Sequence, residues 1–145
     1  MTDNLHAQKH EEATVRAFIV RDKQDRVLSF LTNPKNRKKI TGELSHFRWL
    51  DRRFATPVKW KANPALKLWA RYEDGNSNLL EFLRSKGAGP TCWVVSEIAA
   101  IDGQELQLEL AIETVSGSGM GTILSCIPGK LAYFEDEDEC LLLIR

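Results

Sequence analysis

Apolar residues recur at helical spacing up to the Gly87–Pro90 segment and follow strand-like patterns after it. The clearest helical stretch follows Asn33-Pro34, a typical helix start because asparagine caps the first turn and proline needs no N–H donor there. Three apolar residues then fall on one face at i, i+4 and i+7: Ile40, Leu44 and Phe47. We therefore predict a helix over residues 34–47 whose exposed face carries three lysines, Lys35, Lys38 and Lys39.

Weaker signals fill the rest of this N-terminal part. Three more helices are predicted from a start signal and an apolar face: one after Asp22 carrying Val27, Leu28 and Leu31, one after Asn63-Pro64 carrying Leu66, Trp69 and Ala70, and one after Asn76 or Ser77 carrying Leu79, Leu80 and Leu83. Residues 14–20 (TVRAFIV) are rich in β-branched and aromatic residues and predict a first strand. Residues 1–12 are predicted to be a mobile polar lead-in.

The C-terminal part predicts a sheet. Residues 91–97 and 140–144 read as buried strands, and residues 121–127 and 130–135 as a hairpin that turns through Pro128-Gly129. Residues 104–116 fit both an alternating strand and a helical stripe, and we favour the helix. The glycines of residues 117–121 would follow a helix and precede a strand, the reverse of a phosphate-binding loop, so we interpret them as a helix cap and strand lead-in.

These elements predict one α/β domain of the α+β-like kind over residues 13–145, with N-terminal helices packed on a mixed sheet made mostly of C-terminal strands. Its 145 residues are enough for one core. The first ten residues are polar and lack the apolar stretch of a signal peptide, and no run approaches about 18 apolar residues, so we expect no membrane association. Three widely spaced cysteines do not suggest a disulfide framework, and we expect a reducing cytoplasm.

Charge is unevenly distributed although the net charge is zero. Residues 1–86 hold 18 of the 20 Lys and Arg against 10 of the 20 acids, a net charge of +8, and residues 87–145 carry −8. The cations that could bind a partner or phosphates lie on the predicted helix and just after it: Lys35, Lys38, Lys39, Arg48, Arg52 and Arg53. Trp49 could stack on a base, although the zero net charge weakens long-range attraction to nucleic acid.

A second hypothesis places a polar pocket at the ends of the predicted strands. Its candidates are Ser96, Glu97, Ser125, Cys126 and Lys130. Strand ends often present functional groups in α/β sheets, but no nucleophile here has an evident base beside it. His6 and His10 are spaced as on one helix face without a third ligand, so we predict no metal site and no cofactor.

No motif specifies a reaction, and three classes of function stay open. We favour a non-catalytic interaction or regulatory protein that uses its segregated charge for a protein partner or for a homodimer. The alternatives are a nucleic-acid-binding module on the basic helix face and a small enzyme at the strand ends.

Overall fold

The computed structural model describes residues 2–58, 60–63, 68–71 and 79–145, without the side chains of residues 2–8, 46, 60–63 and 68–71. This part of the chain forms five α-helices, α1 (Thr2–Phe18), α2 (Gln24–Leu31), α3 (Arg37–Thr41), α4 (Leu79–Ser85) and α5 (Leu108–Val115). Three short 3-10 helices accompany them, η1 (Arg21–Lys23), η2 (Leu44–His46) and η3 (Arg52–Phe54).

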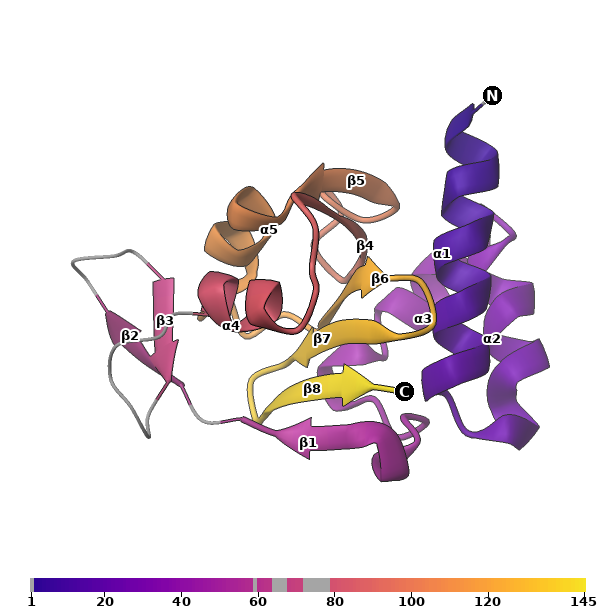
Figure 1. Ribbon diagram of the computed structural model, residues 1–145. Coiled ribbons are helices and arrows are strands. Elements are labelled where there is room, and N and C mark those ends of the chain that lie inside the picture. The colour runs from indigo at the N-terminus through magenta and orange to yellow at the C-terminus, as the bar shows by residue number, and fades with distance from the viewer. Residues whose placement is uncertain (1, 59, 64–67, 72–78) are drawn as a thin grey trace.

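Eight strands complete the described part: β1 (Ala55–Pro57), β2 (Trp60–Asn63), β3 (Leu68–Arg71), β4 (Thr91–Ser96), β5 (Gln104–Gln107), β6 (Thr122–Ile127), β7 (Leu131–Glu135) and β8 (Cys140–Ile144). Six of them form one sheet in the order β1-β8-β7-β6-β4-β5, and β2 pairs with β3 alone (Figure 1). All pairings of the described strands are antiparallel, so the sheet is not the predicted mixed one. The fold class, α+β with N-terminal helices and mostly C-terminal strands, is as predicted.

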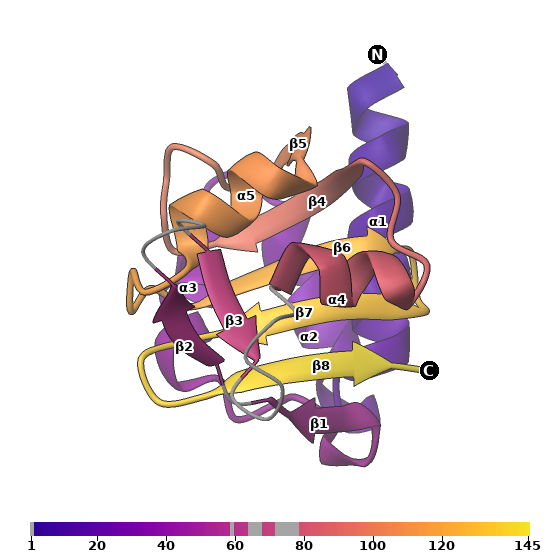
Figure 2. The ribbon, with the colours of Figure 1, turned by 60° about the vertical axis from the view of Figure 1, so that its left-hand side comes forward.

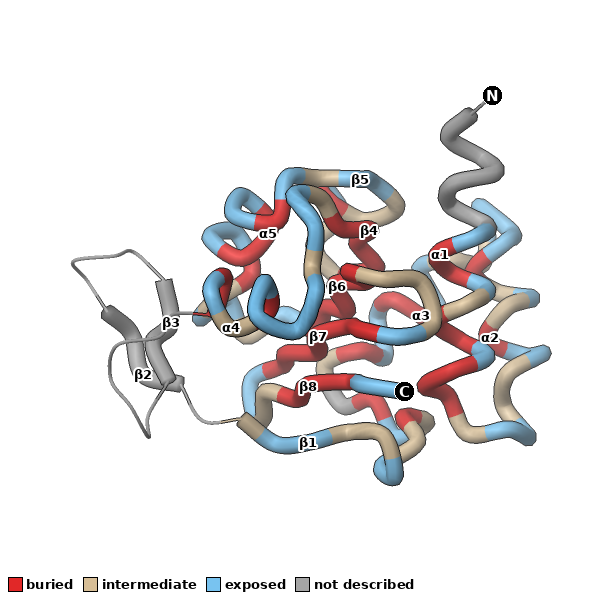
Figure 3. Tube along the Cα trace, viewed as in Figure 1, coloured by how far each residue is buried: buried red, intermediate tan, exposed pale blue. Residues whose placement is uncertain are grey.

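Helices cover both faces of the large sheet. α1, α2 and α3 pack on one face and α4 and α5 on the other, as the two views show (Figures 1 and 2). The side chains of β8 alternate between the two layers, with Leu141 and Leu143 in the first cluster and Leu142 in the second. The strand predicted to be buried, residues 140–144, is thus covered on both faces. The inner strands β4, β6, β7 and β8 are mostly buried, whereas the edge strands β1 and β5 are largely exposed (Figure 3).

The first predicted strand is wrong. Residues 14–18 form the end of α1, and only Ile19 makes an isolated bridge, to Leu50. Burial follows a helical rhythm, since His10 and Glu11, Thr14 and Val15, and Ala17 and Phe18 are all buried. Packing of this face on the sheet outweighs the preference of β-branched residues for strands. The same helix includes residues 2–12, which the sequence analysis assigned to a mobile lead-in.

The predicted helix over residues 34–47 is interrupted, although its buried face is correct. α3 ends at Thr41, and η2 follows Gly42 and Glu43. The apolar residues Ile40, Leu44 and Phe47 are buried, and the lysines Lys35, Lys38 and Lys39 are exposed. The helix also begins later than predicted, at Arg37 instead of Pro34. The Asn33 side chain accepts a hydrogen bond from the Lys35 amide (3.0 Å), but Asn33 lies four residues before the first residue of α3.

The sheet itself follows the sequence prediction closely. β4, β6, β7 and β8 occupy the predicted segments, and Gly129 in the β6–β7 turn has φ +72°, the left-handed value that favours glycine there. Residues 104–116, for which we favoured a helix over a strand, contain both. The first part, with alternating apolar residues, is β5, and the part with helical spacing is α5. α4 buries the three predicted leucines, Leu79, Leu80 and Leu83.

The helix predicted after Asn63-Pro64 is wrong where the structure describes it. Leu68–Arg71 is strand β3, paired antiparallel with β2 in the register Trp60 to Arg71 and Asn63 to Leu68. Asn63 is the last residue of strand β2. Pro64, Leu66 and Gly75, and the proposed caps Asn76 and Ser77, lie outside the described residues.

Candidate functional site

The chain between η2 and η3 is tied to the end of α1 by backbone hydrogen bonds. The amide of Val20 donates to the carbonyl oxygen of Trp49 (2.8 Å), and the amide of Asp51 donates to that of Phe18 (2.7 Å). Between these two bonds Leu50 is buried. Because its backbone is hydrogen-bonded on either side of Leu50, this short segment has a fixed path beside the end of α1.

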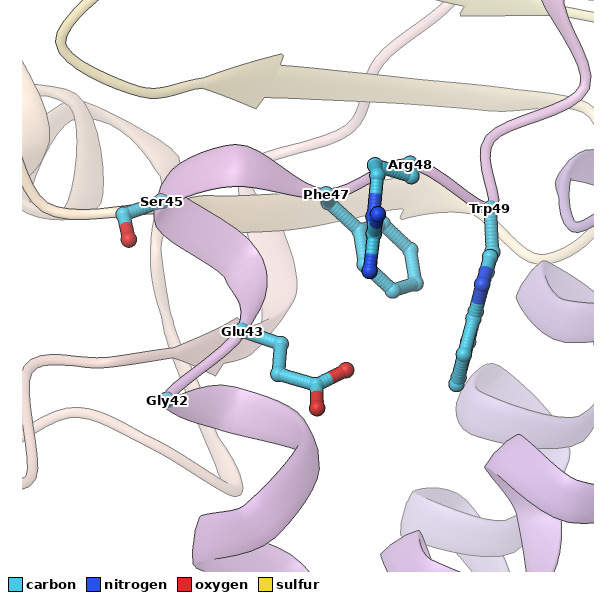
Figure 4. Close-up of a pocket in the computed structure, with 6 residues that line it drawn as sticks. All are labelled: Gly42, Glu43, Ser45, Phe47, Arg48 and Trp49. Atoms are coloured by element: carbon cyan, nitrogen blue, oxygen red, sulfur yellow. The ribbon is translucent and has the colours of Figure 1, made fainter.

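A pocket of about 420 Å³ opens beside this segment. Six residues from the end of α3, η2 and the chain after it line the pocket: Gly42, Glu43, Ser45, Phe47, Arg48 and Trp49. In Figure 4 the Glu43 carboxylate and the Trp49 indole lie on opposite sides of the space, and the Arg48 side chain lies between them in front of the Phe47 ring. One hollow therefore presents a carboxylate, a guanidinium group and an aromatic face.

Neighbouring side chains hold the Trp49 ring in place. The Phe47 ring is buried and lies 6.0 Å from the indole, centroid to centroid, at an interplanar angle of 58°. The Lys23 ammonium lies 5.5 Å from the indole centroid, within cation–π range. Trp49 remains half-buried, so part of the indole stays accessible from the pocket.

The predicted partner-binding cations divide into two groups. Arg52 donates two hydrogen bonds to Glu139, each of 2.9 Å, and Arg53 donates to the Asp51 carboxylate at 2.8 and 3.0 Å. The hydrogen bond to Glu139 raises the pKa of Arg52, and that from Arg53 lowers the pKa of Asp51. Both arginines are therefore largely neutralised by acids of the same molecule.

The other predicted cations form no such ion pair within the described part of the chain. The ion pairs formed by the described residues do not include Lys35, Lys38, Lys39 or Arg48, and Glu43 is also outside them. Lys38 and Lys39 lie on α3, three to five residues before the pocket residues Gly42 and Glu43. We call the exposed residues Lys35, Lys38, Lys39, Glu43 and Arg48, together with the half-buried Trp49, the α3–Trp49 surface.

The predicted strand-end residues are not brought together. Ser96 and Glu97 lie beside the start of β6, where the Ser96 hydroxyl is 2.7 Å from that of Thr122 and the Gly121 amide donates to the Glu97 carboxylate (2.8 Å). Lys130 is exposed in the turn after the other end of β6. Cys126 is buried in the layer under α4 and α5, and burial raises the pKa of its thiol to about 12, so the thiolate is not formed at neutral pH.

Ser125 meets a histidine that the sequence analysis had placed in a mobile tail. His10 Nδ1 lies 2.9 Å from Ser125 Oγ, and the Thr14 hydroxyl donates to the same oxygen (3.2 Å). The His10 ring also stacks on Trp93, with 6.1 Å between centroids. Ser125 is only 2% exposed and His10 7%, so the hydroxyl lies beneath α1, away from solvent. We interpret this contact as a link between helix and sheet.

A partly buried ion-pair network also joins the N-terminal helices to the sheet. Arg37 donates to both oxygens of Glu11 (2.8 Å each) and to both oxygens of Asp102 (2.7 and 3.0 Å). Trp93 Nε1 donates to Glu11 (2.8 Å), and the Ser96 amide donates to Asp102 (3.0 Å). Burial opposes the charge of Arg37, but its hydrogen bonds to Asp102 and Glu11 outweigh burial and raise its pKa. Arg37 is thus occupied within the fold.

The acidic run at residues 135–139 has a buried first member. Glu135 accepts hydrogen bonds from the Tyr133 hydroxyl (2.7 Å) and from the Gly117 amide (3.0 Å), which fastens the loop after α5 to β7. Burial raises the pKa of the Glu135 carboxyl above its ordinary value. Asp136 accepts from the amides of Asp138 and Glu139 and closes the β7–β8 turn. The run is therefore accounted for by local structure.

Comparison with known proteins finds no family model, no curated protein and no solved structure that matches the chain. Within the described part, no three His, Cys, Asp or Glu side chains are grouped to hold a metal ion; the side chain of His6 lies outside that part. None of the described helices is long and apolar enough to cross a membrane. The α3–Trp49 surface combines a pocket with exposed cations, and we take it as the candidate site.

Proposed function

We propose that this protein is a non-catalytic binding module that takes single-stranded nucleic acid on the α3–Trp49 surface. One observation carries the proposal: a half-buried tryptophan and an arginine line one pocket together with Gly42 and Glu43, and Lys38 and Lys39, which no described acid neutralises, lie three to five residues before that pair on α3. Proteins that bind single strands combine these two features, because aromatic rings stack on bases while cations follow the phosphates.

The pocket favours an unpaired base over duplex DNA or RNA. A base in a duplex is already stacked on its neighbours and offers only its edges, whereas an unpaired base exposes a whole face to an indole. The Phe47 and Lys23 contacts of Trp49 support this role, since a platform that is already fixed loses little freedom when the ligand binds.

The two other classes of function have less support. An enzyme at the strand ends would need Glu97 and Lys130 in one cleft, and these residues lie beyond opposite ends of β6. An acidic protein partner would account for Lys35, Lys38 and Lys39 but gives no role to the pocket between Glu43 and Trp49. An acidic protein partner is therefore the main alternative, and it would be favoured if the protein bound no nucleic acid.

Fluorescence anisotropy with a labelled single-stranded oligonucleotide tests the proposal. In the double variant Lys38→Glu/Lys39→Glu, affinity should fall at least about tenfold, because two phosphate contacts become repulsive. The matched control is Arg84→Glu/Lys86→Glu, which makes the same change of net charge at and just after the end of α4, on the opposite side of the sheet. This control should bind nearly as well as the wild-type protein.

Salt dependence gives a second readout of the same surface. If Lys38, Lys39 and Arg48 each meet one phosphate, log affinity should fall with log salt with a slope of about −2, at roughly 0.7 per contact for a single strand. Absence of binding at low salt would contradict the proposal. An equal loss in the α3 and α4 variants would also contradict it, because binding would then follow net charge alone.

A further inference from the structure

The pocket holds two opposite charges that do not neutralise each other. Glu43 and Arg48 both line it, yet neither belongs to an ion pair among the described residues. In Figure 4 the carboxylate points across the space toward the indole, while the guanidinium group lies above and between them. A ligand that fills this hollow therefore meets a hydrogen-bond acceptor, a cation and an aromatic face at the same time.

These three groups define the chemistry of the ligand. The indole can stack on a flat ring, and the guanidinium group can bind an anion such as a phosphate. An ionised carboxylate only accepts hydrogen bonds, and it offers two oxygens side by side. The free carboxylate can therefore bind a ring that carries N–H donors in its plane. A carboxylate would repel an ordinary anionic ligand, so its presence in an otherwise cationic region selects a ligand that carries such donors.

We propose that the pocket is a guanine-reading subsite, an inference that rests on the proposed function. The base stacks on Trp49, its ring N1–H and its exocyclic 2-amino group donate to the two Glu43 oxygens, and the adjoining phosphate binds Arg48. Guanine is the common base whose pairing edge places two N–H donors side by side. Adenine and cytosine each offer one amino group beside a ring nitrogen lone pair, and uracil and thymine offer one N–H between two carbonyl oxygens.

The size and setting of the pocket fit one nucleotide. Its volume of about 420 Å³ falls within the roughly 300–1,000 Å³ of small-molecule sites. Lys38 and Lys39 lie five and four residues before Glu43 in the chain, so the phosphates on either side of the bound base would meet cations that form no ion pair with the described residues. The pocket would then read one base while the lysines hold the strand without regard to its sequence.

Binding of four labelled thymine pentamers with guanine, adenine, cytosine or thymine at the centre tests the subsite. At low salt, we expect the guanine pentamer to bind the wild-type protein at least about tenfold more tightly than the other three, the discrimination of one good paired hydrogen-bond contact. In Glu43→Gln this ratio should collapse, because the amide offers only one acceptor: guanine affinity falls, and thymine affinity rises as a negative charge near the phosphates is removed. Glu109→Gln, on the exposed face of α5, is the matched control and should keep the ratio.

The outcomes separate this inference from the function on which it rests. Equal binding of the four pentamers, or a guanine preference that survives in Glu43→Gln, overturns the guanine subsite and leaves single-strand binding in place. Failure of every pentamer and of longer single strands to bind at low salt overturns both. A guanine preference lost in Glu43→Gln, together with weaker binding of all four pentamers by Arg48→Gln, supports the assignment of base and phosphate to these two side chains.

Discussion

Replacing Arg37 by methionine should be among the most damaging single changes to the fold. Arg37 connects Glu11 on α1 with Asp102 in the loop between β4 and β5, and its side chain is 18% exposed against 6% for Glu11. Methionine fills a similar volume but donates no hydrogen bond. The Glu11 carboxylate would then keep only the Trp93 indole N–H of its three described donors and would remain a buried charge without a cation.

The expected cost follows from this geometry. Breaking a buried ion pair by removing one partner costs about 3–5 kcal/mol, since the other charge is left uncompensated. The lower end applies here, about 3 kcal/mol, because Arg37 and Asp102 keep some contact with solvent. Glu11→Gln/Arg37→Met should recover about half of this loss, because the remaining amide is neutral and can still accept from Trp93.

Urea unfolding followed by tryptophan fluorescence measures both effects. With a slope of about 1.5 kcal/mol per molar urea, a loss of about 3 kcal/mol lowers the midpoint by about 2 M. The neighbouring exposed residue supplies the control, since Lys38→Met should change stability by about 0.5 kcal/mol or less. A cost below about 1 kcal/mol for Arg37→Met, or strictly additive effects in the double variant, would refute the view that the network is a coupled, buried unit.

Two further predictions concern the sheet. Gly121→Ala should destabilise the protein by about 3 kcal/mol in the same assay and should weaken oligonucleotide binding. The reason is that the added methyl group would overlap the backbone of Leu44 beside the pocket. The control is Gly89→Ala, which should be nearly neutral because nothing lies within 4 Å of its added methyl group. Because the pKa of Glu135 is raised in the folded protein, the folded state binds the carboxyl proton more tightly than the unfolded chain does. The protonated carboxyl therefore contributes most to stability below its ordinary pKa of 4.5, and this contribution falls as the pH rises through the raised pKa. Unfolding free energies of wild-type protein and Glu135→Gln should diverge over this range, and a constant difference would show that the carboxyl does not titrate abnormally.

The predictable parts of the fold are those whose signal lies within one segment. The burial of Ile40, Leu44 and Phe47 follows from their spacing, and the β6–β7 hairpin follows from Pro128-Gly129 and its flanking apolar runs. Residues 14–18 were misassigned because strand propensity is a weak preference, and the helical choice is made by packing of α1 on a sheet formed from the last third of the chain. No local pattern distinguishes these two outcomes.

Only part of the candidate site could be predicted from the sequence, because some of its features depend on contacts between distant segments. Arg48 and Trp49 stand out by residue type within a basic stretch, and both line the pocket. Glu43 was only counted as an acid, since a charge count does not tell whether an acid neutralises a neighbouring cation or stays free. The neutralisation of Arg52 by Glu139 and the engagement of Arg37 by Glu11 and Asp102 bridge 87, 26 and 65 positions of the chain, so these pairs became visible only in the folded structure.

Amide chemical-shift mapping with a guanine-containing single-stranded oligonucleotide tests the central claim most directly. Titration of the labelled, full-length protein at low salt should shift resonances of α3 and of residues 42–49 first and most, together with the Trp49 indole N–H. Resonances of α4 and α5, on the far face of the sheet, should stay in place (Figure 1). Shifts centred on α4 or α5, or no shifts at all at low salt, would contradict the assignment of the α3–Trp49 surface as a nucleic-acid interface.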